Sequence, residues 1–233
     1  MAFENVDALE IMFKQQLCSS DYSVVFLVLL RSQTCIMKVR HGPGVLDGFT
    51  NRRVVSWIST YLSLQHIIDL RSKGYAIVEL WPQFLGTLEK FDPRQCQPFR
   101  KAFIEDQSLP SAIFLAYIPN LDMPNLQNCT EKRLEALVRG VREIHEASVR
   151  HRDPKPRNIM VINDDPDRVV WVDVDRAETY NKKQLTDRQK DFLDEEEIMV
   201  REFRNGLVSP LMPFIFRPVE VFAQYIFVSV MRH

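Results

Sequence analysis

Residues 145–177 read HEASVRHRDPKPRNIMVINDDPDRVVWVDVDRA, and this stretch is the most informative part of the sequence. It contains His151-Arg152-Asp153, then Asn158 five residues after the aspartate, then Asp173 at the end of an apolar run. Phosphoryl transfer from ATP needs one carboxylate for the attacking hydroxyl, and an amide and a second carboxylate to hold magnesium on the phosphates. A charged surface loop is the alternative interpretation. It is disfavoured because the matched positions follow an amphipathic helical pattern and precede a strand pattern.

The pattern on both sides of this stretch is that of a mainly helical region. Apolar residues at steps of three and four after Thr130 predict a helix that ends near Ser148, with Thr130 as its N-cap. A hairpin is expected next, with strands at 158–162 and 168–172. A last helix is predicted over 186–203, capped by Thr186. Its expected apolar positions are Phe192, Leu193, Ile198, Met199 and Phe203.

The first half of the chain is dominated by strand patterns. β-Branched and apolar runs predict strands at 23–30, at 34–39 with Lys38 inside it, and at 111–118. Residues 9–17 favour a strand, although a helix also fits, and 77–86 indicate a strand and turn. A single helix is expected at 52–70, with Val55, Ile58 and Leu62 turned inward.

Together these patterns predict an α+β fold of two lobes. The expected domains are a β-rich N-lobe over 1–118, a shortened and mainly α-helical C-lobe with the catalytic loop over 119–206, and an apolar tail over 207–233. The longest uncharged stretch of the tail is too short for the roughly 20 residues of a spanning helix. We therefore expect a tail packed on the core or poorly ordered, and no membrane span.

Bulk properties narrow the class of protein. The chain has 233 residues, 45% hydrophobic and 26% charged, which are ordinary globular values. A formal net charge of −1 gives no electrostatic footprint for nucleic acid. The cysteines form no CxxC pair and indicate reduced thiols. The acidic N-terminus lacks the features of a signal peptide, so a cytoplasmic location is expected, with the nucleus as an alternative.

The order of these segments resembles the protein kinase-like superfamily, and more closely a group of small fungal protein kinase-like proteins. The similar segments include FLVLLRSQTCIMKVRHGPG, LPSAIFLAYIPN, LVRGVREIHEASVRHRDPKPRNIMV and RVVWVDVDRAETY. The resemblance implies a two-lobed kinase fold, ATP and Mg²⁺ as cofactors, and a hydroxyl acceptor.

The resemblance also implies a role for each matched residue. Asp153 would be the catalytic base, and Lys155 would approach the γ-phosphate. Asn158 and Asp173 would hold the magnesium. Lys38 would contact the phosphates, and the backbone of a hinge would bind adenine, its residues being Ala116, Tyr117 and Ile118. His151 is expected to brace the loop.

Three departures from the kinase pattern keep other functions open. The glycine positions of the phosphate-binding loop become Cys18, Ser20 and Ser23, and residues 52–70 contain no glutamate to pair with Lys38. Asp173-Val174-Asp175 replaces Asp-Phe-Gly, and too few residues follow it for a full peptide-binding platform. The sequence therefore predicts an atypical ATP-dependent kinase, acting on protein serine or threonine. The alternatives are a catalytically impaired pseudokinase that binds or regulates, and a small-molecule phosphotransferase.

Overall fold

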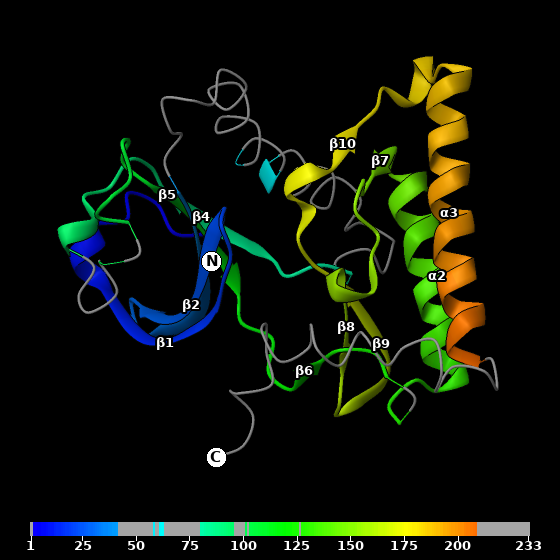
Figure 1. Cartoon of the computed structure of the whole chain (residues 1–233), viewed down its shortest axis with the longest axis horizontal. Coiled ribbons are helices and arrows are strands. Elements are labelled where there is room, and N and C mark those ends of the chain that lie inside the picture. Colours follow the sequence, from blue (N-terminus) through cyan, green and yellow to red (C-terminus); the bar gives the residue numbers. More distant parts are fainter. Residues whose placement is uncertain are drawn as a thin grey trace. The chain divides into compact units, whose positions relative to one another are not determined.

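A computed structural model of the chain describes residues 2–41, 58, 61–62, 80–95, 101, 103–125 and 127–208 (Figure 1). The described residues fall into two compact units. The first contains residues 2–41, Ile58 and the described residues from 83 to 117, and the second contains Tyr61, Leu62, Leu80–Pro82 and the described residues from 118 to 208. The first is rich in strands and the second in helices, which confirms the α+β fold class.

The first unit is built on a five-stranded antiparallel sheet of order β1-β2-β3-β5-β4. Its strands are β1 (Ile11–Ser19), β2 (Ser23–Leu30), β3 (Gln33–Arg40), β4 (Phe84–Leu88) and β5 (Ser111–Ala116). In β2 every second side chain is buried, as expected for a strand with one face on the core. The predicted strands at 23–30 and 34–39 are confirmed. Residues 9–17 are mostly strand, after a 3-10 turn at Ala8–Glu10.

Some predictions for this part of the chain need correction, and others fall on residues outside the described ranges. The strand predicted at 77–86 is β4, which begins later, at Phe84. Of the predicted helix at 52–70 only Ile58, Tyr61 and Leu62 are described, and all three are helical. Ile58 is buried as predicted. Leu62 is not, since it is 49% exposed, and Tyr61 is buried instead.

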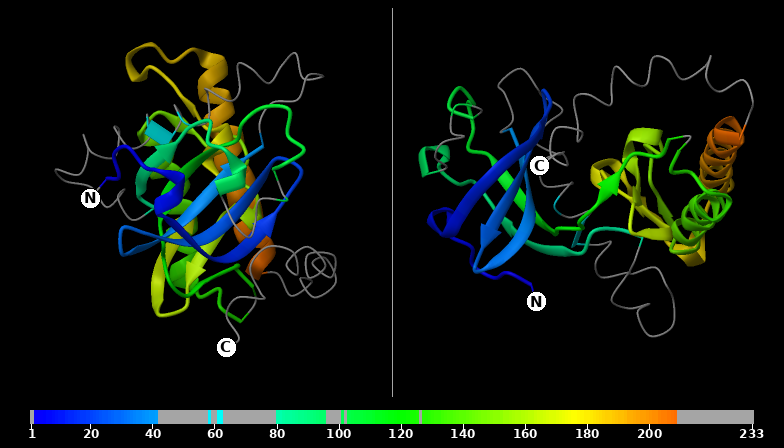
Figure 2. Two further views of the ribbon diagram at one scale, coloured as in Figure 1. Left: turned by 90° about the vertical axis from the view of Figure 1, so that its left-hand side faces the viewer. Right: turned by 90° about the horizontal axis from the view of Figure 1, so that it is seen from below.

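The second unit has two long helices, α2 (Glu131–Glu146) and α3 (Asp187–Val208), which pack side by side (Figure 2). A small sheet of order β6-β8-β9 is formed by β6 (Leu121–Asp122), β8 (Ile159–Ile162) and β9 (Asp165–Trp171), and its strand β9 packs against α2. A second ladder pairs β7 (Val149–Arg150) with β10 (Glu178–Thr179). Among the described residues, no helix has the length and apolar character of a membrane span.

Both helices begin at the residues that the sequence indicated. The Thr130 hydroxyl accepts a hydrogen bond from the Arg133 N–H at 3.2 Å. The Thr186 hydroxyl accepts one from the Gln189 N–H, and the Gln189 side chain accepts the Thr186 N–H at 3.0 Å in return. This reciprocal pair is a capping box, which satisfies backbone donors that the first turn of α3 would otherwise leave free.

The register of α3 differs from the prediction. Ile198 and Met199, which were expected to face inward, are 56% and 49% exposed. The buried positions are Leu193, Glu196, Val200 and Leu207, spaced so that they lie on one face of the helix. Leu207 packs against Leu134 of α2. It and Val208 are the described residues of the tail predicted over 207–233, whose remainder lies outside the described residues.

A buried arginine fastens α2 to the β8–β9 hairpin. Arg133 is 5% exposed and donates to three backbone carbonyls. These are Asn128 O at 2.5 Å, Asp165 O at 3.0 Å, and Ile162 O. The guanidinium therefore joins the start of α2 to both ends of the hairpin turn.

We expect Arg133→Met to lower the free energy of unfolding by about 3 kcal/mol, because buried carbonyls lose their donors while the volume is largely kept. Urea unfolding measures this change. The matched control is Arg139→Met on the same helix, since the Arg139 side chain is 63% exposed and its ion pair with Glu143 spans 3.8 Å. That control should change stability by less than about 0.5 kcal/mol. Equal effects of the two substitutions would contradict the role given to Arg133.

Candidate active site

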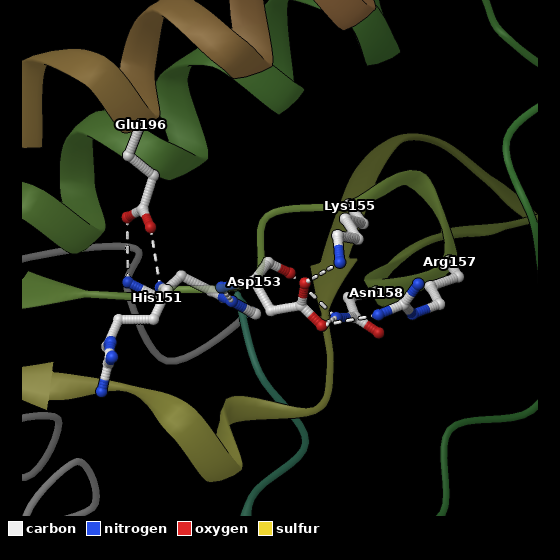
Figure 3. Close-up of polar contacts among 7 residues, drawn as sticks. His151, Asp153, Lys155, Arg157, Asn158 and Glu196 are labelled. Carbon is white, nitrogen blue, oxygen red and sulfur yellow. Dashed lines mark hydrogen bonds and ion pairs between the residues drawn. The ribbon is translucent and has the colours of Figure 1, made fainter.

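Asp153 is the centre of a group of polar side chains in the second unit (Figure 3). Its carboxylate lies 3.0 Å from Lys155 Nζ through Oδ1 and 2.8 Å from Arg157 Nη2 through Oδ2. The Asp153 side chain is 7% exposed, whereas the two cations are about half exposed. The carboxylate is thus held in the protein, with positive charge on its solvent side.

The surroundings of Asp153 keep it ionised at neutral pH. Burial raises the pKa of its carboxyl group. The hydrogen bond from Lys155 and the charge of Arg157 outweigh that effect and hold the pKa below the ordinary aspartate value. An ionised Asp153 can accept hydrogen bonds but has no proton of its own to donate.

Asn158 is oriented by Asp153. Its Nδ2 donates to the Asp153 carbonyl at 2.8 Å and to Asp153 Oδ2 at 3.1 Å. Both partners are acceptors, so the NH₂ group must face them and the amide oxygen must point away. The 3-10 turn Pro156–Asn158 produces this placement; the sequence had predicted strand from 158, and strand β8 begins one residue later.

The hairpin brings Asp173 to the same end of the unit as Asn158. Ile159 of β8 is paired with Trp171 of β9, and the Val172 N–H donates to the Asn158 carbonyl at 2.9 Å. Asp173 follows directly, in the left-handed region with φ 60° and ψ 52°. Aspartate tolerates that region better than most residues, and here it turns the chain away from β9.

The donor set fits a magnesium ion bound together with phosphates. An amide oxygen at Asn158 and a carboxylate at Asp173 are hard oxygen ligands, and Mg²⁺ is commonly held by one or two carboxylates plus substrate phosphates and water. Within the described ranges, no group of three or more His, Cys, Asp or Glu side chains could hold a metal ion.

His151 has the bracing position that the sequence indicated. It is fully buried. Its ring stacks on that of Trp81, with 6.4 Å between the ring centroids, and packs against that of Trp171, with 5.4 Å between the centroids. Its Nε2 lies 3.1 Å from the Val172 carbonyl. Because burial lowers its pKa, the imidazole is neutral at neutral pH, and Nε2 carries the proton that it donates to this carbonyl.

Glu196 of α3 bonds to the backbone of the loop that carries Asp153, and sequence reasoning missed it. It is 3% exposed. Its Oε2 accepts the His151 N–H at 2.9 Å and lies 2.9 Å from His145 Nε2, while its Oε1 accepts the Arg152 N–H at 2.7 Å (Figure 3). Arg152 is in the left-handed region, with φ 67°. The carboxylate therefore fixes the strained backbone just before Asp153.

A sequence signal for Glu196 existed but was ambiguous. An acid at an inward position of an amphipathic helix indicates a buried, partnered carboxylate. Three successive glutamates, Glu195 to Glu197, occupy this part of α3, and the helical period alone did not single out the inward one. Arg157 was also missed, although its spacing of four from Asp153 permits the ion pair seen here.

The remaining predicted residues lie in or next to the first unit. Lys38 is on β3 opposite Val25 and Ile113, and it is 9% exposed. Ala116 ends β5, and its N–H donates to the Gln83 carbonyl at 2.8 Å. Tyr117 is the last residue of the first unit, and Ile118 is the first of the second unit's main segment. The nucleotide contacts of these residues stay predictions.

The β1–β2 turn contains Ser20 and Ser23, two of the positions at which the kinase pattern has glycine. The Ser20 hydroxyl accepts the N–H groups of Tyr22 at 3.3 Å and Ser23 at 3.1 Å. The Ser20 N–H donates to the Ser23 carbonyl at 2.9 Å. A phosphate-binding loop offers such N–H groups to its ligand. In this turn they are already used within the chain.

Comparison with known protein families finds a match over the part of the chain that contains Asp153. Residues 94–202, a little under half of the chain, match the model of the lipopolysaccharide kinase (Kdo/WaaP) family. No curated protein matches the chain.

Two kinase structures are similar to the chain at low identity. One is the autoinhibited serine kinase domain of the giant muscle protein titin, at 12% identity, covering 74% of this chain and 47% of that one, with a TM-score of 0.49. The other is a twitchin kinase fragment from C. elegans, at 14% identity, covering 79% of this chain and 36% of that one, also with a TM-score of 0.49. The chain thus spans less than half the length of either structure.

The family match covers the catalytic loop, Asp173 and Glu196 in one segment. This kinase-like family indicates an ATP-dependent phosphotransferase with a hydroxyl acceptor. The family match supports a protein kinase-like superfamily for this chain.

Proposed function

We propose that the chain transfers the γ-phosphoryl group of ATP to a hydroxyl group, with protein serine or threonine as the acceptor. One observation carries this proposal: Lys155 and Asn158 converge on the ionised carboxylate of Asp153. A structural role alone does not require an aspartate with this set of partners beside an amide oxygen that points away from it.

Each residue of the group has a distinct task in this proposal. Asp153 would accept the hydrogen bond of the acceptor hydroxyl and orient its oxygen toward the phosphorus. Lys155, half exposed at 51%, would reach the γ-phosphate. Asn158 and Asp173 would hold the magnesium, which when bound neutralises charge on the phosphates. Positioning and electrostatics supply most of the catalysis in such transfers.

A sugar hydroxyl is the second acceptor class. It is supported by the match to a family whose name refers to lipopolysaccharide. The catalytic group itself does not distinguish the two classes, because both present an alcohol oxygen to Asp153. Radiolabel transfer from ATP to a serine/threonine peptide library, beside transfer to a lipopolysaccharide core oligosaccharide, separates them.

A catalytically impaired nucleotide-binding module is the competing function. The observation in its favour is the β1–β2 turn, where Ser20 takes up two backbone N–H groups that a phosphate loop would offer. This function predicts nucleotide binding without transfer. An active enzyme with such a turn is expected to be slow, below the ~1–100 per second of typical kinases.

Thermal unfolding with and without millimolar ATP and Mg²⁺ tests the nucleotide site. At a hundred times the dissociation constant the ligand adds ~2.7 kcal/mol of stability, which raises the melting temperature by roughly 5–10 °C in a chain of this size. Asp173→Ala should lose the magnesium-dependent part of the shift.

Asp167→Ala is the matched control, since Asp167 is 57% exposed and pairs with Lys132 away from the loop. It should keep the full shift. A well-folded wild-type protein with no shift would refute the proposed function. A shift without transfer or ATP hydrolysis would favour the impaired module.

A further inference from the structure

The segment after Asp173 returns to the strand that leads into the catalytic loop. We call residues 177–182 the docked segment. Within it, β10 pairs antiparallel with β7, with Glu178 opposite Arg150. The Tyr180 N–H donates to the Ser148 carbonyl at 2.7 Å, and Lys182 Nζ donates to the Glu146 carbonyl at 3.3 Å. Backbone bonds and one bond from the Lys182 side chain thus hold this segment against the residues just before His151.

Glu178 adds a side-chain link to the loop itself. Its Oε1 lies 2.9 Å from Arg152 Nη1, and its Oε2 accepts the Tyr180 hydroxyl at 3.0 Å. Arg152 immediately precedes Asp153. The carboxylate therefore connects the docked segment to the residue next to the candidate catalytic base.

Arg152 is bonded through both its backbone and its side chain. Its N–H donates to the buried Glu196 from one side, and its guanidinium meets Glu178 on the other. Its backbone is in the left-handed region, a conformation that costs a non-glycine residue free energy and needs support from its surroundings. Glu196 supports the backbone, and Glu178 can fix the direction in which the side chain leaves it.

We infer that Glu178 is a positioning residue: through Arg152 it holds the docked segment and the catalytic loop together, so that the site is assembled without covalent phosphorylation. The inference rests on the proposed function and describes the regulation of that same site. In phosphorylation-controlled enzymes an added phosphate orders a segment by pairing with arginine. Here a carboxylate of the chain already supplies the negative charge, next to the exposed hydroxyl of Thr179.

The link is partly exposed, which limits its strength. The Arg152 and Glu178 side chains are 47% and 41% exposed, and exposed ion pairs are weak and weakened further by salt. The expected effects are therefore modest, about two- to five-fold, and smaller at high salt.

Amide hydrogen exchange in the full chain measures the link without reference to activity. Glu178→Gln should speed exchange of the Tyr180 amide two- to five-fold, and 0.5 M NaCl should reduce the difference. Glu10→Gln is the matched control. Glu10 pairs with Arg31 at 2.6 Å, and these side chains are about as exposed as Glu178 and Arg152. The control pair lies in the first unit, whereas the docked segment lies in the second. Unchanged exchange in Glu178→Gln would overturn the inference.

ATP turnover before and after phosphatase treatment tests independence from phosphorylation. Wild-type turnover should not change on treatment, whereas Glu178→Gln should lower kcat two- to five-fold and leave the KM for ATP unchanged. Loss of turnover on phosphatase treatment would also overturn the inference. If no variant turns over ATP, the proposed function fails, and the exchange result still decides whether Glu178 holds the segment.

Discussion

Asp153→Asn is expected to lower phosphoryl transfer by at least about 100-fold while Mg²⁺–ATP binding stays nearly unchanged. The substitution keeps the shape of the side chain but removes the carboxylate that would accept the acceptor hydroxyl's proton, an effect typically of 10²–10⁴ in rate. Asn158 and Asp173, the proposed magnesium ligands, are retained. Steady-state transfer assays beside the nucleotide-induced thermal shift measure the two quantities separately.

The fold should survive this substitution. The cations that pair with Asp153 are about half exposed, so water can solvate them when the carboxylate is lost. We expect a loss of no more than about 1 kcal/mol in stability. Asp167→Asn is the matched control and should keep full activity. Turnover that persists in folded Asp153→Asn would remove Asp153 from the mechanism.

Glu196→Gln is expected to lower the free energy of unfolding by about 3 kcal/mol and to reduce transfer as well. The buried carboxylate accepts the N–H groups of His151 and Arg152 and pairs with His145. Hydrogen bonds to a charged group contribute about 1.5–3 kcal/mol each, and the amide replaces one acceptor oxygen by a donor. Urea unfolding measures the loss. Glu197→Gln, one residue on and paired with Arg142 and Arg201 at the surface, should cost less than about 1 kcal/mol.

The effect of Glu196 should depend on pH in a definite direction. Burial raises its pKa, but the hydrogen bonds from His145 and from the two backbone N–H groups outweigh burial and hold the pKa below the ordinary value of 4.5. A lowered carboxyl pKa stabilises the fold above the unfolded-state value, and this contribution is lost as the pH falls through the folded-state pKa. The stability difference between wild type and Glu196→Gln should therefore shrink below about pH 4.5. A difference that is constant from pH 7 to pH 3 would contradict this role of the ionised carboxylate.

Local sequence determined much of this protein. The alternation in residues 23–30 and the stripe after Thr130 predicted β2 and α2, because the period of buried side chains follows directly from strand and helix geometry. Asp153, Lys155 and Asn158 lie within six residues of one another. A single tight turn therefore brings them together; the spacing pointed to Asp153 and Asn158, and the resemblance to kinases added Lys155.

Tertiary structure decided the parts that depend on distant residues. Glu196 bonds to the loop 45 residues before it, and Glu178 pairs with Arg152 across the β7–β10 ladder. Neither could be predicted, because helical periodicity gave adjacent glutamates similar weight and placed Ile198 and Met199 inward. Which face of α3 is buried follows from its packing against α2 and the loop. The backbone N–H groups of that loop need an acceptor when they are buried, and it is this requirement that turns Glu196 inward.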